Sequence, residues 1–190
     1  MVIHTLVPKD SQDNLKYQNF PSGELISLEP DCYWLIQQGI VKISARTEEG
    51  VAISLGYWGA GDLVGQPLSL VYPYQVQCIT SVRASCISVS QSYQITSLIQ
   101  RQIRQTEEFL RILRSETTYP RLCKILLWMA NKFGRSVEIG TVIELRLTHQ
   151  DLAELVGATR VTVTKTINQL EQEGFLNRPE RNTIVILNNN

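Results

Sequence analysis

The chain has 190 residues, of which 43% are hydrophobic and 19% are charged. This balance is typical of a globular protein and excludes collagen-like and disordered chains, and the length allows one large core or two small ones. Because the formal net charge is zero, any binding to nucleic acid has to depend on the local placement of basic side chains.

Several other classes of protein are excluded by what the sequence lacks. No apolar run reaches the roughly 18 to 20 residues that span a bilayer, and the first residues lack a signal-peptide pattern, so we expect a cytoplasmic protein with no membrane partner. The two histidines, His4 and His149, lie outside the strand-rich segment described below, and metal sites need clustered ligands. We therefore expect no metal, no cofactor and no enzymatic activity.

The four cysteines do not form a recognisable pattern. Cys32, Cys78, Cys86 and Cys123 are scattered without C-x-x-C spacing, which argues against a zinc site or a disulfide framework. We interpret them as small buried thiols. A reactive thiol needs a basic neighbour or a helix N-terminus, and Cys123, close to Pro120, is the one candidate.

The first half of the chain predicts a β-roll over residues 1–90. Short segments rich in Val, Ile, Tyr and Ser are separated by glycines, which is typical of strands in a sandwich or barrel-like roll. These segments are residues 24–30, 32–45, 51–58 and 76–90.

The period of the apolar residues changes at Gln91, where a long helix is predicted over residues 91–117. Apolar positions in it step by three or four residues, forming one narrow stripe. The stripe consists of Ile95, Ile99, Ile103, Thr106, Leu110 and Leu113. A stripe this narrow favours a two-helix seam between two copies of the chain, and the alternative is a helix lying on its own roll.

Residues 118–190 predict a winged helix-turn-helix. Pro120 favours a new helix start, and the helix of residues 120–134 is followed by a strand at 142–147, two helices, and a hairpin at 175–187. Thr148 is placed to cap the first of these two helices, with Asp151 reaching back to it.

The second of these helices has an inner and an outer face. Val163, Ile167 and Leu170 share a narrow sector that packs on the core. A different sector carries Arg160, Val161, Thr164 and Lys165, with Asn168 beside them. An arginine can donate two hydrogen bonds to guanine and a branched apolar side chain can contact a thymine methyl, so this sector predicts base recognition in the major groove.

Phosphate contacts are predicted around this recognition helix. Thr159 and Thr162 lie at its start, where hydroxyls and backbone amides can hold phosphates. Arg178 and Arg181 lie in the predicted wing, from which they could reach the DNA backbone.

These residues together resemble the CRP/FNR family of dimeric bacterial transcription regulators. The resemblance covers nearly the whole chain and is carried by "GDLVG" at 61–65, by Arg121-Leu122, and by "LTHQDLAELVGATRVTVTKTINQLEQEGFL" at 147–176. It implies an α+β fold: an N-terminal β-roll of the cyclic-nucleotide-binding type (a double-stranded β-helix), a dimerisation helix and a winged helix-turn-helix. A homodimer bound to double-stranded DNA, with RNA polymerase as a further partner, is also implied.

The recognition helix is most similar to that of the NtcA-type nitrogen regulators of cyanobacteria, which bind palindromes that begin with GTA and end with TAC. The resemblance implies that Arg160 contacts guanine and that Val161 stands where cyclic-AMP receptors carry a glutamate. Lys165 replaces the family's usual arginine and lacks its forked geometry. Thr148, Gln150, Thr159 and Thr162 match positions that the family uses on phosphate.

The predicted roll departs from the family's effector sites. Where cyclic-nucleotide binders carry Gly-Glu and Arg-Ser or Arg-Thr pairs, this chain has Gly65-Gln66-Pro67 and, near the phosphate position, Tyr74 and Gln75. A buried phosphate would lack a cation there, so we expect no cyclic-AMP dependence.

The position of the helix arginine that holds 2-oxoglutarate in nitrogen regulators aligns with Gln102, although Glu107 matches their glutamate. A dicarboxylate would need Arg83 or Arg101 to be re-aimed. Two versions remain open: a regulator without an effector, and one that responds to redox state or to an unidentified small molecule such as 2-oxoglutarate.

Overall fold

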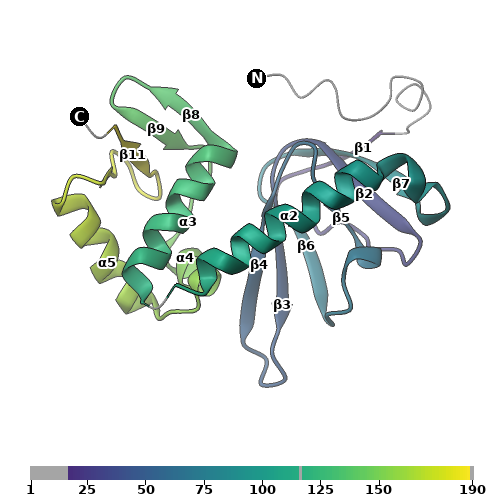
Figure 1. Ribbon diagram of the computed structural model, residues 1–190, viewed down its shortest axis with the longest axis horizontal. Coiled ribbons are helices and arrows are strands. Elements are labelled where there is room, and N and C mark those ends of the chain that lie inside the picture. The colour runs from purple at the N-terminus through teal and green to yellow at the C-terminus, as the bar shows by residue number, and fades with distance from the viewer. Residues whose placement is uncertain (1–16, 116, 189–190) are drawn as a thin grey trace. The chain divides into compact units, whose positions relative to one another are not determined.

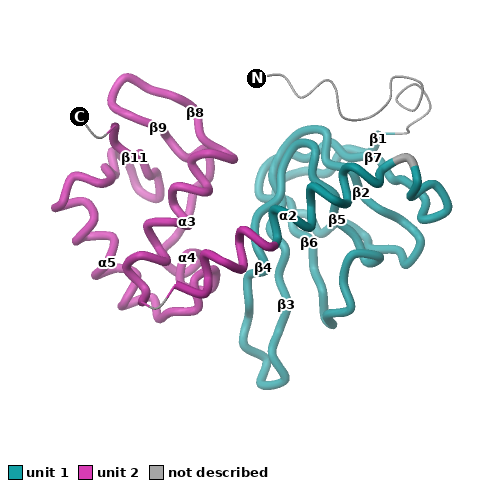
Figure 2. The backbone as a smooth tube through the Cα atoms, in the orientation of Figure 1, with its two compact units in different colours: residues 1–106 teal, residues 107–190 magenta. Residues whose placement is uncertain are grey.

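The structure is a computed structural model that describes residues 17–115 and 117–188, apart from the side chain of Gln94. The chain forms two compact units, residues 1–106 and 107–190, and their boundary falls within the long helix α2 (Thr96–Leu113) (Figures 1 and 2). The sequence expectation about a signal peptide concerns residues that lie outside the described part. No helix among the described residues is long and apolar enough to cross a membrane.

The first unit is the predicted roll. One sheet has the strand order β1-β7-β2-β5 and the other has the order β4-β3-β6. The strands are β1 (Tyr17–Phe20), β2 (Cys32–Gln38), β3 (Val41–Arg46), β4 (Ala52–Trp58), β5 (Leu63–Val64), β6 (Tyr74–Cys78) and β7 (Val82–Ser88), with a short 3-10 helix η1 (Gln66–Leu68). The two indoles of Trp34 and Trp58 belong to the core that fills the roll.

Several details of the roll differ from the sequence prediction. Residues 24–30 do not form a strand, since Leu25 makes only an isolated bridge with Gln77. Strand β1 was not predicted because three of its four side chains are exposed, which removes the alternating apolar pattern.

The long helix is shorter than predicted. Residues Val89–Ile95 form a 3-10 helix, η2, and α2 begins only at Thr96 and ends at Leu113. Ile95 and Leu98 are buried in the roll's second apolar cluster, so the start of the helical segment anchors on its own roll.

The second unit is the predicted winged helix-turn-helix. It contains α3 (Thr118–Phe133), β8 (Gly134–Val137), β9 (Gly140–Ile143), α4 (His149–Val156), α5 (Arg160–Gln172), β10 (Leu176–Asn177) and β11 (Val185–Leu187), and its sheet has the order β10-β11-β9-β8. The strand predicted at 142–147 is wrong in its bounds. Gly140 lies against the carbonyl of Ile186 on β11 in a conformation that favours glycine, so pairing begins there and ends at Ile143.

Local signals fix the helix-turn-helix. The Thr148 side chain accepts a hydrogen bond from the Asp151 amide and the Asp151 carboxylate accepts one from the Thr148 amide, forming the predicted capping box of α4. Gly157 ends α4 in the left-handed conformation. Val163, Ile167 and Leu170 are fully buried, as the sequence predicts.

The expectation of four thiols is wrong. Cys32 and Cys86 form a disulfide, with Cα atoms 5.8 Å apart. They lie on the antiparallel neighbours β2 and β7, where Cys86 is the register partner of Trp34. Spacing along the chain gave no signal because the two residues are 54 positions apart.

Candidate nucleic-acid interface

The outer face of α5 presents three of the four predicted base-reading residues to solvent. Arg160, Val161 and Lys165 are exposed, and Val161 keeps 66% of its surface accessible. Within the described residues, the side chains of Arg160 and Lys165 make no hydrogen bond or ion pair. The first turns of α5 therefore carry a guanidinium, an ammonium and an isopropyl group side by side.

Thr164, the fourth predicted base-reading residue, is held by its neighbours. Its hydroxyl donates to the carbonyl of Arg160 one turn earlier, with 2.8 Å between the oxygens. The same oxygen lies 2.8 Å from Nδ1 of His149, the first residue of α4. Because its hydroxyl is engaged on both sides, Thr164 offers a groove chiefly its methyl group.

Sequence reasoning did not assign a role to His149. It is half-buried, and burial together with the positive charges of Arg178 and Arg160 lowers its pKa. A lone histidine carries no pattern, and its partner Thr164 lies 15 residues away on another helix.

The four predicted phosphate contacts at the helix starts are near the surface. Thr159 caps α5 by accepting from the amide of Thr162, and their hydroxyl oxygens are 2.9 Å apart. Thr148 caps α4 in the same way, and the Gln150 amide donates to Glu154 at 3.2 Å. These side chains thus order the helix starts, where free backbone amides favour anions.

A cleft of about 740 Å³ lies within the winged unit. It opens between the starts of α4 and α5 and the wing that joins β10 to β11. The lining residues that can carry charge are His149, Arg160, Glu171, Arg178, Glu180 and Arg181.

Arg178 of the wing is bound to α5. Its guanidinium donates to the carboxylate of Glu171, with Nε to Oε2 at 3.1 Å, and to the side-chain oxygen of Asn168 at 2.9 Å. The hydrogen bonds from Arg178 lower the pKa of Glu171. Arg178, for which the sequence predicts a contact with the DNA backbone, instead fastens the wing to the recognition helix in the structure. Arg181 is exposed.

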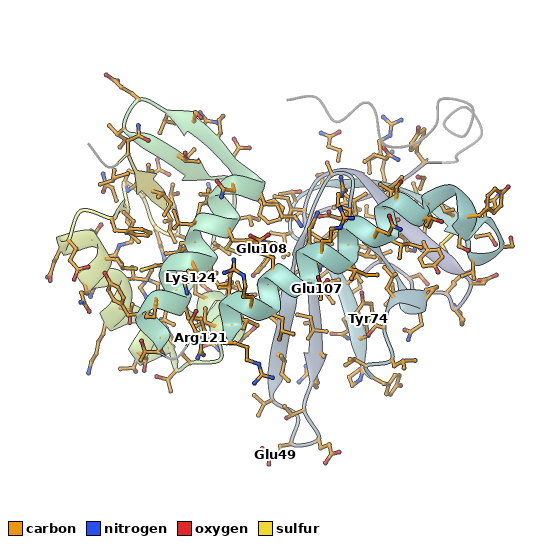
Figure 3. The ribbon with its side chains drawn as sticks, in the orientation of Figure 1. Glu49, Tyr74, Glu107, Glu108, Arg121 and Lys124 are labelled. Atoms are coloured by element: carbon orange, nitrogen blue, oxygen red, sulfur yellow. A yellow bond between two sulfur atoms is a disulfide. The ribbon has the colours of Figure 1, made fainter. Side chains whose placement is uncertain are left out.

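Arg121, labelled in Figure 3, connects the helices of this unit. Its guanidinium donates to the carbonyl of Val156 at the end of α4, at 2.6 Å, and to the carbonyl of Ser115, at 2.9 Å. Lys124, also labelled, donates to the Ser115 hydroxyl at 3.1 Å. Arg121 is thus a structural residue that fixes the position of α4.

The predicted effector region of the roll is occupied by its own side chains. Tyr74 (Figure 3) packs against the roll core, with its phenol near the backbone of Gly65. Burial raises the pKa of Tyr74 to about 12. The Gln66 amide donates to the carbonyl of Ser69, and residues 47–82 contain no lysine or arginine.

The two arginines considered for a dicarboxylate both have other contacts. Arg101 on α2 donates to the carbonyl of Gly61 and lies 3.5 Å from the carboxylate of the buried Asp62. The guanidinium of Arg83 lies 4.1 Å from the ring centre of Tyr17.

The cysteine expected to be most reactive does not have a lowered pKa. Burial raises the pKa of the Cys123 thiol, and it raises that of Cys78 to about 11. Within the described part of the chain, no group of three histidine, cysteine or carboxylate residues is placed to hold a metal ion.

The predicted dimer stripe divides between two environments. Ile95 is buried and Ile99 and Leu113 are half-buried, whereas Ile103 and Leu110 are 54% and 53% exposed. Thr106 lies between these two and is also exposed, although its hydroxyl donates to the carbonyl of Gln102 one turn earlier. The middle of α2 therefore presents an uncovered apolar stripe.

Known proteins similar to this chain are regulators. Residues 120–190 match the Crp-like helix-turn-helix domain. The chain is 42% identical over 155 residues to the regulatory protein CysR of Synechococcus elongatus, covering 80% of this chain and 75% of the relative. A global nitrogen regulator of the same organism is 29% identical over 184 residues, covering 85% and 82%.

The fold has close matches among solved structures. A CRP/FNR-family transcriptional regulator of Thermus thermophilus superimposes with a TM-score of 0.75 over 91% of this chain and 94% of that one, at 24% identity. That similarity confirms the predicted α+β architecture.

Proposed function

We propose that this chain, which belongs to the CRP/FNR family of DNA-binding transcription regulators, acts as a homodimer on a palindromic DNA site. Its family makes it a regulator of transcription and not an enzyme. The observation that carries the proposal is the outer face of α5, where Arg160, Val161 and Lys165 stand exposed.

Each exposed side chain has a part in base recognition. Arg160 is assigned to guanine, where its guanidinium can donate to O6 and N7 together. Val161 and the methyl group of Thr164 are assigned to thymine methyl groups. Lys165 donates to an acceptor further along the groove. The similarity of "TRVTVTK" to nitrogen regulators supports a site of the GTA-to-TAC kind.

Phosphate contacts surround this face. Thr148 and Gln150 at the start of α4, and Thr159 and Thr162 at the start of α5, are assigned to the DNA backbone because helix N-termini favour anions. Arg181 is assigned to the backbone from the wing. The contacts of Arg178 with Glu171 and Asn168 support a role in holding that wing in place.

The exposed stripe of α2 is assigned to the dimer. Ile103 and Leu110 are the large apolar residues that a second α2 would cover. A two-fold dimer would set two recognition helices about 34–36 Å apart, one turn of DNA, which predicts a palindromic site. RNA polymerase is the expected partner of the bound dimer, by family resemblance.

We infer that the protein does not depend on cyclic AMP. The phenol of Tyr74 lies beside Gly65, and a phosphate buried there would have no cation from residues 47–82. The contacts of Arg101 with Gly61 and Asp62 weigh against 2-oxoglutarate as an effector, since binding it would break them.

The test is fluorescence anisotropy with a labelled GTA-to-TAC duplex and a scrambled duplex, each at two salt concentrations and without effector. We expect the palindrome to bind at least about 100-fold more tightly than the scrambled duplex, a preference of a few kcal/mol. Equal, salt-sensitive binding to both duplexes would contradict base recognition in the free protein. Repeating the titration with 2-oxoglutarate or cyclic AMP then tests the effector.

The dimer is tested with the double variant I103E/L110E. Placing carboxylates on the stripe should give a monomer in analytical ultracentrifugation and weaken palindrome binding by at least about 100-fold, since one half-site then binds alone. Leu70→Glu is the matched control because Leu70 is fully exposed on the roll. A double variant that stays dimeric would place the interface elsewhere.

A further inference from the structure

We propose that His149 is a proton-linked positioning residue of the DNA interface: it joins the start of α4 to the base-facing turn of α5 and takes up a proton when a DNA phosphate enters the cleft. The inference rests on the proposed function for its DNA. The role of His149 itself rests on its contact with Thr164 and on its place in the lining of the cleft.

The two contacts of the Thr164 hydroxyl can both be hydrogen bonds for one tautomer of the ring only. The Thr164 hydroxyl has a single hydrogen, which it donates to the carbonyl of Arg160. Nδ1 of His149, 2.8 Å from the same hydroxyl oxygen, must therefore be the donor of that contact. In the neutral ring the hydrogen is on Nδ1, which leaves Nε2 unprotonated. A proton added at Nε2 leaves the contact with Thr164 intact.

The contact fixes the first turn of α5. His149 lies directly after the cap of α4, and Arg160 is the first residue of α5. Through the Thr164 hydroxyl, the ring holds the turn of backbone that carries the base-reading guanidinium. The position of Arg160 relative to the start of α4 thus depends on a side chain that titrates.

The charges around the ring explain a change of pKa on binding. The charged groups around the ring lie on three elements. Asp151 is in the capping box of α4, and Arg160 and Glu171 lie on α5. Arg178, Glu180 and Arg181 lie on the wing. Burial and the positive charges of Arg178 and Arg160 lower the pKa of the ring, which favours its neutral form in the free protein. A phosphate in the cleft adds negative charge and favours the protonated ring.

The sign of the pH dependence follows from linkage. Because the pKa in the complex is proposed to exceed that in the free protein, binding takes up a proton. Affinity then rises as the pH falls through the pKa of the complex and levels off below the pKa of the free protein. A difference of one pKa unit corresponds to about tenfold in affinity. We expect a gain of about 3- to 10-fold between about pH 8 and about pH 6.

The experiment measures anisotropy at these two pH values for four proteins. They are the wild type, H149N, T164V and H4Q. The variant H4Q is the matched control, because it removes the other histidine. The wild type and H4Q should both gain affinity at the lower pH, for palindrome and scrambled duplex alike, since phosphates are common to both. H149N retains a side-chain donor but cannot titrate. The ratio of its affinities at low and high pH should therefore fall to about one.

T164V separates positioning from titration. It should retain the gain at low pH because the ring still titrates. It should lose part of the preference for the palindrome because the turn that carries Arg160 is no longer held. A low-pH gain of equal size in H149N and the wild type would overturn the inference while leaving DNA binding intact.

NMR of H4Q, which retains one imidazole, tests the contact without DNA. Nitrogen shifts at high pH should show Nδ1 protonated and Nε2 unprotonated, and the pKa should rise when the duplex is added. The opposite tautomer, or a pKa unchanged by DNA, would overturn the inference. Absence of DNA binding at both pH values would overturn the proposed function. The proposed proton uptake on binding would then be overturned as well.

Discussion

The roll and the winged unit use the same kind of side chain in opposite ways. In the roll, Arg101 is bound by the chain itself, through the carbonyl of Gly61 and the buried carboxylate of Asp62. In the winged unit, Arg160 stands on an exposed helix face with no internal hydrogen bond among the described residues. The neighbours of each arginine therefore decide whether its guanidinium binds within the chain or stays available to a ligand.

The difference has a physical cause in burial. Asp62 is almost wholly buried, and a buried carboxylate is costly unless it is hydrogen-bonded, so the amide of Gly59 and Arg101 converge on it. Around Arg160 the neighbouring side chains bind one another instead, with Thr164 held by His149. The recognition face is therefore ordered without using its own charged groups.

Among the arginine and lysine variants that test this comparison, the largest effect is expected for R160A, on DNA binding. Loss of the guanidinium should reduce affinity for the palindrome about 10- to 100-fold, corresponding to about 1–3 kcal/mol of base discrimination, with little change for the scrambled duplex. Anisotropy with both duplexes measures this. Arg135→Ala is the control, since Arg135 lies on β8 in an exposed pair with Glu144. Equal losses of affinity for the two duplexes would show that Arg160 contacts a phosphate and not a base.

The next effect is on stability, by R101A in the roll. Removing the guanidinium leaves the Asp62 carboxylate with one fewer donor, and the free energy of unfolding should fall by about 1–3 kcal/mol. Urea unfolding measures the change, and R104A, an exposed arginine of the same helix, is the control. Folded R101A should keep the preference for the palindrome. Loss of that preference without unfolding would show that Arg101, like Arg160, is needed for base recognition.

The smallest effect is expected for K165R. An arginine can donate two parallel hydrogen bonds where a lysine acts as a point charge, so palindrome binding should tighten by up to about tenfold. Lys124→Arg on α3, away from this face, serves as the matched control. Weaker palindrome binding by K165R would show that the groove at this position is fitted to lysine.

Local signals in the sequence are enough to predict the helix-turn-helix and the inner face of α5. The signals are local: Thr148 caps α4 with Asp151 three residues away, and Gly157 ends that helix. Val163 and Ile167 repeat at the helical period and are fully buried. Contacts within one turn of helix depend on few neighbours, so residue type and spacing are enough to predict them.

Which side chains come into contact across the fold depends on the tertiary structure and cannot be predicted from the sequence pattern. The Cys32–Cys86 disulfide joins residues 54 apart, Arg101 and Asp62 are 39 apart, and His149 and Thr164 are 15 apart. These meetings depend on strand register and helix packing, which no spacing along the chain encodes. For the same reason the sequence predicts no contact between Arg178 and Glu171, whereas in the fold they form a hydrogen-bonded pair.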